Sequence, residues 1–213
     1  MTVLFDVCVI GHVARDINTI LGVEHAPSPG GAAYYSTMVY CRLGMRAAVV
    51  TKVAVEDEPL LAELKDAGVA VFNLPSEVTT TFRNVYPLSN PDVRVQRVDA
   101  RAGPIAAAAL PDLRARIWQI GPLTKSDVEL AMIGRCAGLG GLVGMDVQGL
   151  TRDVVDGEVR ASEAAVQGGR QVAVLSRDTR SDPGMVVPLA EELLASGVQL
   201  FIGPDTVALT VQL

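Results

Sequence analysis

Aromatic side chains are scarce in this chain of 213 residues. They make up 4% of the sequence, with a single tryptophan, so Ala, Val, Leu and Ile must build most of the interior. An interior of this kind suits buried parallel strands covered by helices, and it favours an α/β fold class. At this length the chain fits one large domain or a core with a small appendage, and two full domains are not expected.

Cysteine and histidine are equally sparse. Cys8, Cys41 and Cys136 are odd in number, lie far apart and lack C-x-x-C spacing, so we expect buried free thiols and no metal or redox role. His12 and His25 are too few and too isolated to form a zinc site. The sequence therefore predicts no metal site.

Positive charge is neither abundant nor clustered. The 18 Lys and Arg residues are outnumbered by 24 Asp and Glu, which gives a net charge of −6. Binding to phosphate backbones requires clustered basic side chains, so no nucleic-acid partner is expected. The sequence also contains no apolar run long enough to span a bilayer, and its N-terminus lacks the features of a signal peptide. We expect a cytoplasmic protein without a membrane partner.

The chain is organised around a glycine-flanked helix at residues 29–44. A Pro-Gly-Gly turn at residues 29–31 precedes this predicted helix, and Gly44 ends it. Small residues recur along one side, so the helix can pack closely against a sheet. Two interpretations of the glycine turn stay open at this point: it serves packing alone, or it lets the backbone approach a ligand.

Strands and helices alternate along most of the chain. The continuous apolar run at residues 3–10 is typical of a central parallel strand. Ser126 is a good helix N-cap with Glu129 three residues later, which predicts a helix from there to Cys136. The β-α-β-α-β order implies right-handed crossovers and a doubly wound, three-layer sandwich. The other predicted strands are 46–53, 69–74, 117–120, 142–146, 171–175 and 199–202, and the other predicted helices are 59–67, 162–166 and 185–195.

Two segments interrupt this alternation of strands and helices, and they predict a small antiparallel sheet. Residues 17–23 form a short half-exposed strand, and residues 78–86 and 93–98 alternate polar and apolar side chains around a proline-containing turn. The excursions cover about 17–28 and 78–98. A small sheet built from two separate excursions suggests a lid over a site, or an edge through which two copies form a homodimer.

Polar residues follow two of the predicted strands. Asp16 lies just beyond the first strand, in the segment that starts at Gly11, and Asp146, Gln148 and Arg152 follow the strand that ends at residue 146. In open α/β sheets ligands bind beyond the carboxyl ends of the strands, so these side chains are candidates for a binding crevice. Local capping by Asp16, and a plain turn at the second segment, are the alternatives.

Together, the Gly11–Asp16 segment, the Pro-Gly-Gly helix, the hairpin and the Asp-Val-Gln-Gly-Leu-Thr-Arg segment resemble the ribokinase-like (PfkB) family of carbohydrate kinases. The resemblance covers roughly residues 3–160 and looks closest to the branch that phosphorylates sugars or cyclic polyols such as inositol. It implies a single ribokinase-like α/β domain over residues 1–213, with an antiparallel β lid. It also implies ATP-dependent phosphoryl transfer to a substrate hydroxyl with Mg²⁺ as a cofactor.

The resemblance assigns substrate binding to Asp16, five positions after Gly11, and to the glycines that precede the helix. Lid side chains at alternating positions could face the same substrate, or they are simply solvated. Tyr34 and Tyr35 stand in a neighbourhood where the family often has an asparagine, so the identity of the sugar is not predicted. The predicted substrate-binding residues are Asp16, Asn18, Gly30, Gly31, Thr81, Arg83, Gln96, Asp146, Gln148 and Arg152.

The family's catalytic Asp-Thr-x-Gly-Ala-Gly-Asp motif does not occur in this sequence. The pairs Asp178-Thr179 and Asp205-Thr206 begin correctly, but neither continues with the glycines or the final aspartate. The family's magnesium-linked Asn-x-x-Glu element is also absent, because no asparagine follows Asn90. We expect the C-terminal part of the fold to be missing or divergent, the chain to be inactive, and no residue to be catalytic. The alternative is a non-catalytic polyol-binding or dimerising protein derived from this fold.

Overall fold

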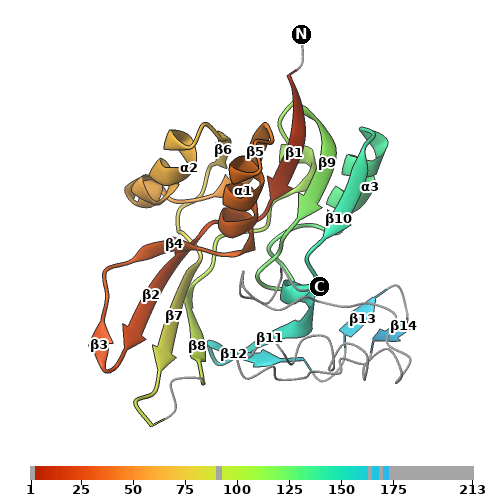
Figure 1. The fold of residues 1–213 in the computed structure, drawn as a ribbon. Helices are drawn as coiled ribbons and strands as arrows, with labels where there is room; N and C mark the ends of the chain where they lie inside the picture. Colours follow the sequence, from red (N-terminus) through yellow and green to blue (C-terminus); the bar gives the residue numbers. More distant parts are fainter. Residues whose placement is uncertain (1–2, 90–92, 163–164, 168–169, 173–213) are drawn as a thin grey trace, which may run out of the picture. The chain divides into compact units, whose positions relative to one another are not determined.

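The computed structural model describes residues 3–89, 93–162, 165–167 and 170–172 (Figure 1). The chain divides into two compact units, 1–161 and 162–213. In the second unit, strands β13 (Ala165–Gln167) and β14 (Arg170–Val172) pair antiparallel. The helix predicted over 162–166 is therefore wrong, since Ala165 and Val166 belong to a strand. The predicted helix 185–195 and strand 199–202 lie outside the described residues, as do positions 173–175.

A five-stranded parallel sheet forms the centre of the first unit. Its strands are β1 (Leu4–Ile10), β5 (Ala47–Lys52), β6 (Ala70–Leu74), β9 (Arg114–Ile120) and β10 (Leu142–Met145), in the order β10-β9-β1-β5-β6. All four neighbouring pairs are parallel. This order confirms the doubly wound sheet, because consecutive strands are added first on one side of β1 and then on the other.

Helices cover both faces of this sheet, as the alternation along β1 requires (Figure 1). Val7 and Val9 are fully buried in one apolar cluster, together with side chains of α1 (Ala32–Arg42) and α2 (Ala62–Asp66). Cys8 and Ile10 point to the other face and pack with side chains of α3 (Ala131–Gly138). The predicted three-layer sandwich is confirmed. None of the helices in the described ranges is long and apolar enough to cross a membrane.

Two predicted helix boundaries need correction. Helix α3 begins at Ala131 with Leu130 as its N-cap, so Ser126 does not start it. The carboxylate of Glu129 instead accepts a hydrogen bond from the Ala107 N–H at 3.0 Å. The segment predicted as one helix over 59–67 is split into a 3₁₀ turn, η1 (Val55–Leu61), and α2. Two further 3₁₀ turns are η2 (Ala107–Ala109) and η3 (Gln148–Thr151).

The second sheet of this unit holds the lid strands and is mixed, not antiparallel throughout. The parallel pair is β2 with β7, and every other pair in the sheet is antiparallel. Strand order is β11-β12-β8-β7-β2-β3, and β4 also pairs with β2. The strands are β2 (Ala14–Ile20), β3 (Val23–Glu24), β4 (Ser28–Gly30), β7 (Thr81–Tyr86), β8 (Val95–Ala100), β11 (Arg152–Val155) and β12 (Glu158–Ala161).

The hairpin of β11 and β12 was not predicted from the sequence. Its turn is Asp156-Gly157, and both residues have positive φ values, 51° and 78°. Asp-Gly between two valine-containing runs is a strong signal for a two-residue hairpin turn. The hairpin adds to β8 through the Glu158–Arg97 pair, so the lid sheet extends to a part of the chain for which no strand was predicted.

Candidate functional site

The strand order places the candidate site beyond the carboxyl ends of β1 and β9. The order of the sheet reverses at β1, and ligands of open α/β sheets bind at such a switch point. Gly11 and Gly121 follow these two strands and lie in close backbone contact. A Cβ atom on Gly11 would stand 2.3 Å from the Gly121 carbonyl oxygen, so only glycine fits there. The chain then enters the lid strand β2.

Asp16 lies on β2 against the glycine turn that precedes α1. Strand β4 pairs with β2 so that Gly30 is opposite Ala14 and Ser28 is opposite Asp16. A Cβ atom on Gly30 would lie 2.1 Å from Asp16 Oδ2, which shows that the carboxylate rests directly on the Gly30 backbone. Gly31 has a φ of 90° and forms the N-cap of α1. The structure thus brings Asp16, Gly30 and Gly31 together.

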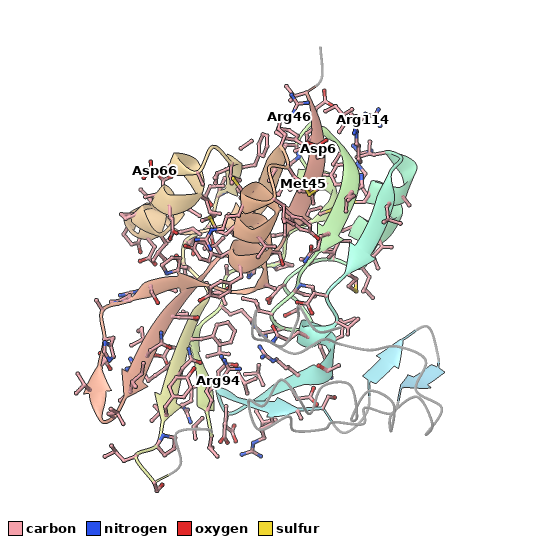
Figure 2. The ribbon with its side chains drawn as sticks, in the orientation of Figure 1. Asp6, Met45, Arg46, Asp66, Arg94 and Arg114 are labelled. Carbon is pink, nitrogen blue, oxygen red and sulfur yellow. The ribbon has the colours of Figure 1, made fainter. Side chains whose placement is uncertain are left out.

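The Asp16 carboxylate is partly desolvated. Burial raises its pKa from 3.8 to about 6, while the positive charges of Arg94 and Arg152 act in the opposite direction. Arg94 lies beside β8 among the lid side chains in Figure 2, and Arg152 begins β11. At neutral pH the group is still largely ionised, so a half-buried acceptor with two cations nearby faces the site.

Asn18 begins a row of amide side chains that crosses three lid strands. Asn84 Nδ2 donates to Asn18 Oδ1 at 3.0 Å, and Gln96 Nε2 donates to Asn84 Oδ1 at 2.7 Å. These residues are also direct neighbours in the strand register. Asp16 is two positions before Asn18 on β2, so its side chain projects from the same face of the sheet. Gln96 therefore lies on the same lid face as Asp16, and so does Asn84, which was not predicted as a site residue.

Thr81 and Arg83 lie on the opposite face of the lid sheet. Arg83 forms ion pairs with Asp99 at 3.1 Å and with Glu24 at 2.5 Å, and both bonds are partly exposed. The Thr81 hydroxyl donates to the Thr79 carbonyl at 3.0 Å. Strand alternation could not show which face is inward, and the register now places both side chains away from Asp16.

The segment after β10 is only partly connected to Asp16. Asp146 Oδ1 accepts a hydrogen bond from the Gln148 N–H at 2.8 Å, so this carboxylate stabilises the local turn. Among the described residues, no hydrogen bond or ion pair joins Asp146 or Gln148 to Asp16. Arg152 is the exception in this segment, because its charge lowers the pKa of Asp16.

A buried histidine at the base of the lid was also missed. His12 Nδ1 lies 2.9 Å from the Thr80 hydroxyl and 3.8 Å from Asp127 Oδ2, and both the His12 and Asp127 side chains are fully buried. Burial lowers the pKa of His12, although the Asp127 charge and the nearby Gly103 backbone oppose this shift. His12 is therefore neutral at pH 7. Asp127 also accepts hydrogen bonds from the N–H groups of Leu123 and Thr124, so this cluster ties the loop after β9 to the lid.

Charged side chains at the amino end of β1 belong to a different region. Figure 2 shows Asp6, Arg46 and Arg114 together at this end of the strand, opposite the lid. The Arg46 N–H donates to Asp6 Oδ2 at 2.9 Å, so the carboxylate stabilises the start of the neighbouring strand. In the part of the chain that the structure describes, no three His, Cys, Asp or Glu side chains are grouped to hold a metal ion. We assign no role in binding ATP or Mg²⁺ to these residues.

Several solved structures with this architecture are kinases. A pyrophosphate-dependent kinase of the ribokinase family, solved with sulfate, is 27% identical to this chain, with a TM-score of 0.67 over 73% of this chain and 55% of that one. A pyrophosphate-dependent kinase of the same family, complexed with a pyrophosphate analogue and myo-inositol, is 24% identical, with a TM-score of 0.66 over 73% and 54% of the two chains. A fructokinase double mutant from Vibrio cholerae O395 with fructose, ADP and potassium is 18% identical, with a TM-score of 0.52 over 67% and 50%.

The fold and these likenesses define a doubly wound α/β protein with a β lid of the kind found in carbohydrate kinases. The chain has the ribokinase-like fold, and its similarity to a pyrophosphate-dependent kinase supports a relationship to the ribokinase family of kinases. No protein-family model matches the sequence, and no curated protein matches it. The chain spans little more than half the length of the solved kinases it matches.

Proposed function

We propose that this chain binds a sugar or cyclic polyol at Asp16, as the phosphoryl-acceptor half of a ribokinase-like site. One observation carries the proposal: the Asp16 carboxylate is held on the Gly30 backbone at the sheet's switch point, with burial raising its pKa to about 6. Burial removes hydration from this carboxylate, and the charges of Arg94 and Arg152 offset only part of that cost, because the pKa of Asp16 stays raised. A ligand hydroxyl that donates to it would offset that cost.

Asp16 and Asn18 complement each other as hydroxyl-binding groups. An ionised carboxylate only accepts hydrogen bonds, whereas a hydroxyl both donates and accepts. Because Asn84 Nδ2 donates to Asn18 Oδ1, the amide NH₂ of Asn18 is left to donate to a second hydroxyl. The amide row, which continues to Gln96, fixes this orientation. Adjacent hydroxyls of a polyol match such an acceptor and donor on one face.

The choice of ligand class is supported by the related structures. One pyrophosphate-dependent kinase was solved with myo-inositol, and the fructokinase was solved with fructose. We therefore place myo-inositol, its stereoisomers and common hexoses first among the acceptors to test. Two phosphoryl donors are relevant, ATP from the family resemblance and pyrophosphate from the related kinases.

The chain is expected to bind its acceptor without phosphorylating it. Phosphoryl transfer needs an anion hole for the developing charge and a base for the attacking hydroxyl, and the sequence lacks the Gly-Ala-Gly-Asp segment that would provide both. Purified chain, incubated with Mg²⁺, each polyol and either ATP or pyrophosphate, should give no phosphorylated product above the enzyme-free background. An intact inositol kinase serves as the assay control. Repeated turnover with either donor would show that this chain phosphorylates its acceptor and would contradict the expectation that it is inactive.

A further inference from the structure

Tyr35 is an exposed aromatic residue at the start of α1, directly after the glycine turn. Its backbone N–H donates to the Gly31 carbonyl at 3.2 Å, so it belongs to the first helical turn. The side chain is 58% exposed, whereas the adjacent Tyr34 is buried and donates its hydroxyl to Glu63. The two rings pack edge to face with centroids 5.2 Å apart, and Tyr34 thereby supports one side of the Tyr35 ring.

Tyr35 also lies within electrostatic range of the candidate site. Burial raises its pKa first, and the charges of Asp16 and Tyr86 then act in the same direction. Tyr86 is two positions beyond Asn84 on β7, so it projects from the lid face that carries Asp16 and the amide row. Figure 1 shows α1 starting where β4 ends, beside the base of β2 and β7. Tyr35 therefore lies near Asp16, and Tyr86 of the lid strand β7 lies near Tyr35.

No hydrogen bond within the described structure joins the Tyr35 hydroxyl to Asp16. The exposed ring of Tyr35 therefore offers an apolar surface beside the polar groups that we propose to bind hydroxyls. A cyclohexane-type or pyranose ring has a face of C–H groups that packs against an aromatic ring, whereas an open-chain polyol has no fixed face of this kind. Ring surface beside a hydroxyl-binding carboxylate is thus suited to cyclic polyols.

We infer that Tyr35 determines specificity, and this inference rests on the proposed acceptor function. The Tyr35 ring packs against the C–H face of six-membered cyclic polyols and so selects them over open-chain polyols. Asp16 supplies hydroxyl recognition common to both ligand classes. Tyr35 supplies the discrimination between them. The hydroxyl of Tyr35 is not required for this role, so phenylalanine is an adequate substitute.

Calorimetric titration of the full chain with myo-inositol and with sorbitol tests the inference. The wild type should bind myo-inositol about 10-fold more tightly, and Tyr35→Phe should keep that ratio within about twofold. Tyr35→Ala and Tyr35→Leu should bring the ratio close to one by weakening inositol binding. Leucine keeps an apolar, helix-compatible side chain, so its result separates loss of the ring from loss of bulk. Leu43→Ala, at the other end of α1 and 71% exposed, is the matched control that should change nothing.

Two results would overturn the inference, and they are distinguishable. If the wild type binds myo-inositol and Asp16→Asn does not, while Tyr35→Ala keeps the full preference for the cyclic ligand, then the role of Tyr35 is wrong and the acceptor function stands. If the wild type binds neither ligand nor any hexose, then the acceptor function itself fails, and the specificity role fails with it.

Discussion

Asp16→Asn is expected to weaken polyol binding about 100-fold while the fold is retained. A hydrogen bond to a charged group contributes about 1.5–3 kcal/mol, and loss of about 2.7 kcal/mol corresponds to 100-fold in affinity. Asparagine has nearly the same shape, so the contact with Gly30 is kept and only the ionised acceptor is lost. Calorimetry on the variant and the parent measures the change. Asp99→Asn on the opposite face of the lid is the matched control, because Asp99 pairs with Arg83 and not with the site.

The same carboxylate predicts how binding depends on pH. With a pKa of about 6, Asp16 is ionised at pH 7.5 and mostly protonated at pH 5. Affinity for a polyol should therefore fall about 10-fold between these values in the parent chain. In Asp16→Asn the profile should be flat over this range. Unchanged affinity of the variant, or a parent profile without this decline, would contradict the assignment of Asp16 as the acceptor.

The folding stability of the parent chain should fall as pH rises, whereas its affinity for a polyol should increase. The pKa of Asp16 is raised on folding, so the folded state binds more protons than the unfolded state between about pH 4 and pH 6. The parent therefore loses stability as pH rises through this window, and Asp16→Asn does not. Partial exposure reduces the effect to about 1–2 kcal/mol in favour of the variant at pH 8 relative to pH 4. Urea unfolding at both pH values measures this difference, which would identify Asp16 as a functional residue that is held at a cost in stability.

Gly11→Ala is expected to destabilise the chain by about 3 kcal/mol. The added Cβ would meet the Gly121 carbonyl oxygen at 2.3 Å and Ala33 Cβ at 3.3 Å, and backbone cannot move aside as a flexible side chain can. Relief of this clash requires the carboxyl ends of β1 and β9 to separate, which also breaks the bond from the Gly121 N–H to the Ile10 carbonyl, 2.8 Å long. Chemical unfolding measures the loss in free energy.

Gly134→Ala is the matched control for this steric argument. Gly134 lies inside α3, and no atom would stand within 4 Å of its new Cβ. Alanine is favoured over glycine in a helix by about 1 kcal/mol, so this variant should be more stable than the parent. If Gly11→Ala were as stable as the parent, the close contact of the two strand ends would not exist in solution.

The main sheet was predictable because burial on both faces leaves a clear signal. Strands such as 4–10 and 47–52 are nearly continuous apolar runs, and glycines with positive φ, at Gly44 and Gly68, end the helices between them. The start of α3 was mispredicted for a physical reason. The carboxylate of Asp127 binds the preceding loop and His12, and this tertiary role overrides the local capping pattern at Ser126.

The candidate site was less predictable than the fold. Asp16, Gly30 and Gly31 were identified from spacing and resemblance, and the register then placed Asn18 and Gln96 on the same face. Which face of a lid strand points toward Asp16 is set by the parallel pairing of β2 with β7. No local sequence pattern encodes that pairing. For the same reason Arg83 could not be separated from the site, and Asn84 and His12 were not recognised, since each acts through partners distant in sequence.

The most direct test of the acceptor site is a titration of the ¹⁵N-labelled chain with myo-inositol, followed by amide chemical shifts. We predict saturable changes centred on Asp16, Asn18, Gly30, Gly31 and Tyr35, and no comparable change at Arg83 or Asp99 on the opposite lid face. The same titration of Asp16→Asn should show no saturation over the range of myo-inositol concentrations that saturates the parent chain. Shifts that cluster elsewhere, or that saturate equally in Asp16→Asn, would contradict a polyol site built on Asp16 and the glycine turn.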